Sequence, residues 1–140
     1  MNRQTRRLVP VLLVLALVSA SCAGTIRDRM RTSALMVGEA ALDIDKMEQQ
    51  IARANPPIYK SPEQAKQANT VLLRMLEAAR AYERGVKAWP ADMPDMPQNI
   101  WEAQSIALKA IAEAEHILAG LPGTEELFKL LTKLRGYLGG

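Results

Sequence analysis

The chain of 140 residues is poor in the residue types on which most catalytic and metal sites depend. It has one cysteine, Cys22, and one histidine, His116, which excludes a disulfide within the chain and leaves too few ligands for a zinc cluster. Aromatic residues make up only 4% of the sequence, which disfavours a β-sandwich. Alanine and leucine are abundant instead, and an apolar share of 49% argues against disorder. The composition therefore predicts a helical protein, and the length suits one domain or two small ones.

The N-terminal segment has the three-part pattern of a secretory signal peptide. Arg3, Arg6 and Arg7 precede 13 almost wholly apolar residues, Leu8–Ala20, and small residues follow at 21–24. The apolar run is too short to span a membrane, which takes about 20 residues. We therefore expect this segment to direct export and to be removed.

The residues Ser19-Ala20-Ser21-Cys22 resemble the lipobox of bacterial lipoproteins, although that family usually has leucine at the position of Ser19. The resemblance implies cleavage between Ser21 and Cys22, so that residues 1–21 are lost and residues 22–24 form the lipid-anchored N-terminus. It also implies that Cys22 is lipidated. Ala23 after the cysteine implies sorting to the outer membrane of a Gram-negative cell, facing the periplasm, or a plasma-membrane anchor in a Gram-positive cell. In the alternative, ordinary cleavage after Ala20 releases a soluble secreted helical adaptor or inhibitor.

The net charge of +3 suggests a nucleic-acid or membrane-surface partner at first sight. The three arginines of the signal peptide account for all of it, because removing them from the 18 basic residues leaves 15, equal to the 15 acidic residues. We therefore expect no nucleic-acid partner.

Proline clusters divide the rest of the chain into four segments, each with apolar residues at spacings of three and four. The predicted helices cover approximately residues 25–54, 62–89, 97–119 and 124–138. Because the connections are short, neighbouring helices should be antiparallel. The sequence predicts an all-α fold for residues 25–140: an elongated antiparallel up-and-down helical bundle of three long helices and a short C-terminal fourth.

Local patterns mark several helix ends. Ser61, with Gln64 three residues later, predicts an N-cap for the second helix, and Asp95 with Gln98 predicts one for the third. Gly120 predicts the end of the third helix. The apolar spacing also places Ile26 and Trp101 against the core.

The one motif that resembles a catalytic centre is Glu113-Ala114-Glu115-His116. Di-iron proteins of the ferritin type use Glu-x-x-His, but they need it twice, and this chain has no second histidine. His116 also lies off the apolar face of its helix, so we expect an exposed side chain rather than a metal ligand. Four acidic residues of the first helix are expected to form a solvated face: Glu39, Asp43, Asp45 and Glu48. We predict no enzymatic activity, no cofactor and no metal site.

Two groups of residues suggest contacts with partners. Arg27, Arg29 and Arg31 follow Cys22 closely and would meet anionic head groups beside a lipid anchor, or else form an ordinary charged helix start. Apolar residues off the main helix faces, among them Leu35, Leu42 and Leu76, either contact a second neighbouring helix or form an exposed strip for a protein partner or self-association.

The sequence thus predicts a small membrane-anchored lipoprotein with a periplasmic helical bundle, in a structural or interaction role such as tethering or docking in the cell envelope. The murein lipoprotein that is crosslinked to the cell wall ends in a basic residue, whereas this chain ends in Gly139-Gly140. No covalent attachment to the cell wall is expected.

Overall fold

The computed structural model describes the backbone of residues 5–139 and the side chains of residues 26–139. This part of the chain forms four helices joined by short connections: α1 (Thr5–Ala52), α2 (Pro62–Ala88), α3 (Gln98–Leu118) and α4 (Glu125–Tyr137). The prediction of an all-α fold with three long helices and a short fourth is confirmed. The helix ends agree closely with the sequence, except that α1 has no start near residue 25 and runs from Thr5 without a break.

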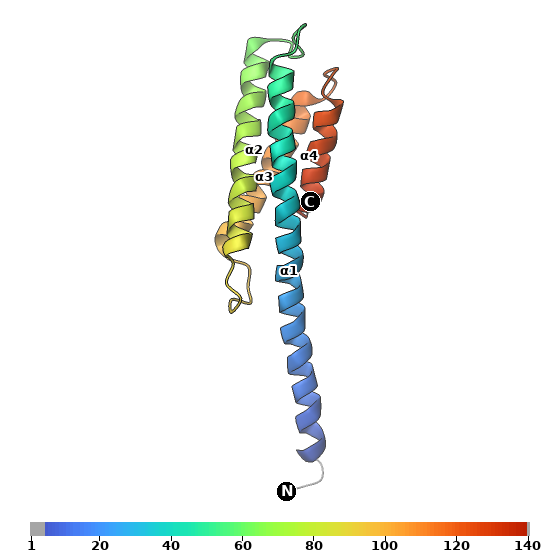
Figure 1. Cartoon of the computed structure of the whole chain (residues 1–140), viewed down its shortest axis with the longest axis vertical. Coiled ribbons are helices and arrows are strands. Elements are labelled where there is room, and N and C mark those ends of the chain that lie inside the picture. Colours follow the sequence, from blue (N-terminus) through green and yellow to red (C-terminus); the bar gives the residue numbers. More distant parts are fainter. Residues whose placement is uncertain (1–4, 140) are drawn as a thin grey trace.

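The helices are arranged as a ring in which each contacts two others (Figure 1). Helix α1 packs against α2 and α4, and α3 completes the ring behind α1, with its most extensive contact on α2. Successive helices run in opposite directions, and the N-terminal half of α1 extends beyond the bundle along its long axis (Figure 1). The connection between α1 and α2 therefore lies at the end of the molecule opposite to the N-terminus.

Helix ends follow the local chemistry only in part. The Ser61 side chain accepts a hydrogen bond from the Gln64 backbone N–H at 3.1 Å, and the Gln64 side chain accepts one from the Lys60 N–H at 2.8 Å, so the predicted cap of α2 is confirmed. Gly120 has a φ of 74°, which favours glycine after the end of α3. The predicted cap of α3 is wrong: Pro97 is the N-cap, without a side-chain hydrogen bond.

The core is formed by one face of each helix, as the apolar spacing predicts. Its largest fully buried side chains include Tyr82, Leu72 and Met75 of α2 and three leucines of α4, Leu127, Leu131 and Leu134. Two predicted core residues are exposed: Ile26 by 57% and Trp101 by 54%. Ile26 precedes the part of α1 that other helices cover, and Trp101 lies on the outer side of α3, beyond the residues that face α2.

Candidate functional site

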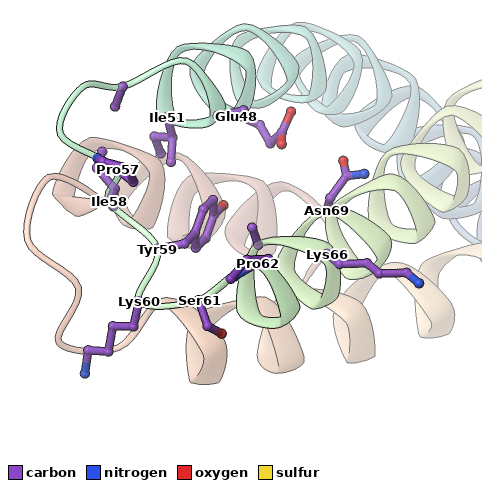
Figure 2. A pocket seen from close by; sticks show the side chains of 13 residues that line it. Glu48, Ile51, Pro57, Ile58, Tyr59, Lys60, Ser61, Pro62, Lys66 and Asn69 are labelled. Atoms are coloured by element: carbon purple, nitrogen blue, oxygen red, sulfur yellow. The ribbon is translucent and has the colours of Figure 1, made fainter.

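A pocket of about 850 Å³ lies at the end of the bundle opposite to the N-terminus (Figure 2). The last turns of α1, the connection at residues 53–61 and the first turns of α2 form its walls. The sequence explains this local structure, because Pro56 and Pro57 prevent α1 from continuing, and Ser61 with Pro62 starts α2. The intervening residues cross the end of the bundle and leave a hollow between the two helices.

Most of the pocket wall is apolar. Ile51 comes from α1, Pro57 and Ile58 come from the connection, and Pro62 and Ala65 come from the start of α2. Ile58 also packs close to Gly123 in the connection between α3 and α4, which ties the wall to the rest of the bundle. The pocket can therefore hold an apolar group of moderate size.

Three polar side chains from different elements line the same pocket: Glu48 of α1, Tyr59 of the connection and Asn69 of α2. Figure 2 shows the Tyr59 hydroxyl and the Asn69 amide on the side of the pocket where Glu48 lies. The Tyr59 hydroxyl oxygen is buried and has no hydrogen-bond partner among the described residues. A buried hydroxyl without a partner is costly, so a ligand that hydrogen-bonds to it would be stabilised.

Burial and the neighbouring Asp45 carboxylate raise the pKa of Glu48 above its usual value. Burial and the Glu48 carboxylate raise the pKa of Tyr59 in the same way. Glu48 makes no ion pair with the described side chains. Glu39 and Asp43 are exposed, as a solvated face requires, whereas α2 and the connection partly cover Glu48.

The pocket residues were missed by reasoning from the sequence. Asn69 is one polar residue among many on α2, and Glu48 follows several other acids on α1. The sequence offers one indication in Pro57-Ile58-Tyr59, where two large side chains occur in a connection too short to have a core of its own.

The three leucines proposed for partner contact do not form one exposed strip. Leu35 and Leu42 are 55% and 53% exposed and lie seven residues apart on the outer face of α1. Leu76 is only 4% exposed and belongs to the core, so its assignment to a partner surface is wrong. Leu76 instead packs inside the bundle against a neighbouring helix, which was the other interpretation of these leucines.

The three arginines near the start of the bundle do not share a face. Arg27 and Arg31 are four residues apart on one side of α1, whereas Arg29 lies on the other side. The Arg31 guanidinium donates a long hydrogen bond of 3.5 Å to the Trp89 carbonyl in the connection after α2. Ser21 and Cys22 lie outside the residues whose side chains the structure describes, so the predictions about cleavage and lipidation stay predictions.

The residues of the Glu-x-x-His motif do not converge on one site. Glu113 forms an ion pair of 3.1 Å with Arg74 of α2, Glu115 pairs with Arg135 of α4, and His116 is exposed. Within residues 26–139, no three histidine, cysteine, aspartate or glutamate side chains lie close enough together to hold a metal ion. The motif therefore connects helices instead of gathering ligands.

Comparison with protein-family models, with curated proteins and with solved structures finds no match to this chain. No helix in the described part of the chain is long and apolar enough to cross a membrane.

Proposed function

We propose that the chain is a small bacterial lipoprotein of the cell envelope, in which a lipidated Cys22 anchors the helical bundle to a membrane, with the outer membrane facing the periplasm as the expected location. Its role is non-enzymatic, either tethering or docking of an envelope partner. The observation that best supports this proposal is the sequence pattern of residues 1–24, above all Ser19-Ala20-Ser21-Cys22 after the basic and apolar segments. In the structure, α1 runs as one helix from Thr5 to Ala52. An anchor at Cys22 would therefore lie on the same helix that α2 and α4 pack against.

Helix geometry gives the distance of other residues of α1 from an anchor at Cys22. At about 1.5 Å per residue, the arginines at 27, 29 and 31 lie within about 15 Å of Cys22 along the helix axis. Near an anionic membrane surface each exposed guanidinium would contribute up to about 1 kcal/mol of attraction, whereas Nε and Nη1 of Arg27 are buried in the structure. Leu35 and Leu42 lie about 20 and 30 Å from the anchor, and Glu48 in the pocket lies about 40 Å away. The anchor thus holds the pocket well clear of the membrane surface.

The intact mass of the purified mature protein tests the anchor. We expect an N-terminal Cys22 carrying diacylglycerol, with the protein in the membrane fraction. Cys22→Ala should abolish both the lipid mass and cleavage before residue 22, whereas the matched control Ser21→Ala keeps a small residue at the cleavage site and should be processed. A Cys22→Ala protein that is processed normally and begins at Ser21 would show the soluble secreted alternative instead.

Photo-crosslinking in cells tests the docking role. A crosslinking residue at Leu35 or at Leu42 should give a discrete product, and a product of twice the chain mass would indicate self-association. Glu126, an exposed residue of α4, serves as the matched control position. If the products from positions 35 and 42 equal those from position 126, the outer face of α1 is not a contact surface.

A further inference from the structure

We infer that the pocket between the C-terminal end of α1 and the start of α2 binds an organic ammonium group carried on an apolar chain. The ammonium would donate hydrogen bonds to the Glu48 carboxylate and to the Tyr59 hydroxyl oxygen, while the chain contacts the apolar wall. Such a group occurs in the lysine side chain of another protein and in free alkylamines. This inference goes beyond the proposed envelope role and does not depend on the lipid anchor.

The shape and chemistry of the pocket define the ligand. Its volume of about 850 Å³ accommodates several methylene groups, and Ile51, Pro57 and Ile58 give them apolar contacts. Glu48, Tyr59 and Asn69 lie on one side, where the buried Tyr59 hydroxyl lacks a partner and Glu48 lacks a cation among the described residues. A ligand with one polar end and one apolar end matches this division.

Charged side chains of both signs line the pocket, and the acidic one lies on the side of the Tyr59 hydroxyl. Asp45 adds a second negative charge beside Glu48, and it contributes, after burial, to the raised pKa of Glu48. Lys60 and Lys66 line the rim, but Figure 2 shows both side chains directed away from Glu48 and Tyr59. A cation placed at Glu48 would relieve the repulsion between the two carboxylates.

The N-terminal end of α2 is not open to an anion, although helix N-termini often attract one. The Ser61 side chain already accepts from the Gln64 N–H, the Gln64 side chain accepts from the Lys60 N–H, and Pro62 has no N–H. The residues at this helix end therefore satisfy most of its hydrogen-bonding groups themselves. The groups left to bind a ligand are the Tyr59 hydroxyl and the Glu48 carboxylate.

Titration of the full-length protein followed by ¹H–¹⁵N NMR tests this inference with three four-carbon probes whose polar ends differ in charge: n-butylammonium, n-butanol and butanoate. The first is the lysine side chain as a free molecule. We expect n-butylammonium to shift the amide signals of Tyr59, Ala65 and Asn69 and to bind at least tenfold more tightly than either other probe. Equal binding of butanol or butanoate, or shifts that are not confined to the pocket, would overturn the inference.

Three conservative variants locate the interaction. Glu48→Gln should weaken n-butylammonium binding at least about tenfold, because it removes a charge-assisted hydrogen bond, and Tyr59→Phe should weaken it about two- to tenfold. Glu63→Gln removes an exposed charge close to the pocket without changing its wall, and should leave binding unchanged. If Glu63→Gln weakens binding as much as Glu48→Gln, the attraction is a general effect of negative charge and the site assignment is wrong.

A fourth probe separates the two sources of the ammonium group. Lysine with both its amino and carboxyl groups blocked carries the same side chain on a peptide backbone. Binding as tight as that of n-butylammonium identifies the pocket as a receptor for a partner's lysine. Binding of n-butylammonium alone identifies it as a site for free amines.

Discussion

Gly85→Ala is expected to destabilise the bundle, although alanine is the better helix former. A Cβ atom at Gly85 would lie 2.8 Å from Cγ1 of Ile100 and 3.3 Å from the Asn99 side-chain nitrogen. Carbon atoms in favourable contact are about 3.5–4.0 Å apart, so the Ile100 side chain would have to move by about 0.7 Å or more. Ile100 is fully buried, which makes that movement costly.

The magnitude follows from two opposing terms. Replacing glycine by alanine within a helix gains about 0.5–1 kcal/mol, and overpacking a core costs about 1–3 kcal/mol. Gly136 in α4 provides a matched control, because a Cβ atom there meets nothing within 4 Å and its φ is not positive. In urea denaturation, the free energy of unfolding of the Gly136→Ala variant should therefore be about 1–3 kcal/mol larger than that of the Gly85→Ala variant. Equal stabilisation by both substitutions would refute the close packing of α3 on α2 at this point.

Three further predictions concern the pocket and the helix faces. Ser61→Ala should lower the free energy of unfolding by about 1 kcal/mol in urea denaturation, because it removes the cap of α2, and no change would mean that the cap is not formed. Leu76→Ala should cost about 2–5 kcal/mol, whereas Leu42→Ala on the exposed face should change stability by less than about 0.5 kcal/mol; similar values would contradict the burial of Leu76. Folding raises the pKa of Glu48, so its ionisation opposes folding: the penalty is absent below the unfolded-state pKa and complete above the folded-state pKa. Glu48→Gln should therefore gain stability relative to the unsubstituted protein as pH rises through this window, which unfolding curves at several pH values would measure. A difference in free energy of unfolding that stays constant with pH would mean that the pKa of Glu48 is not raised.

The helices could be predicted from the sequence because their determinants are local. Proline clusters, the Ser61 cap and the spacing of the leucines in α4 all act within a few residues, and the structure agrees with each. Leu76 was harder to place, because its burial depends on how closely the neighbouring helices approach α2. Trp101 was assigned to the core because it is apolar. Apolar character alone does not indicate which side of α3 has a neighbouring helix.

The pocket could not be predicted because it depends on the path of a connection. Glu48 and Asn69 are separated by 20 intervening residues, and only the way in which residues 53–61 cross the end of the bundle brings them to Tyr59. Helical periodicity, which places α1 and α2, has no counterpart for such a segment. The pKa perturbations follow from this same tertiary proximity and are invisible in the sequence.

Because the pocket wall comes from two helices and the connection between them, it exists only while those elements are folded together. By mass action, any molecule that occupies it must shift the folding equilibrium toward the native state. At a free ligand concentration 100 times its dissociation constant, the stabilisation is about 2.7 kcal/mol. For a chain of this size that corresponds to a rise of roughly 10 °C in the melting temperature. The melting curve of the protein is thus an assay for its own ligands, whatever their chemical identity.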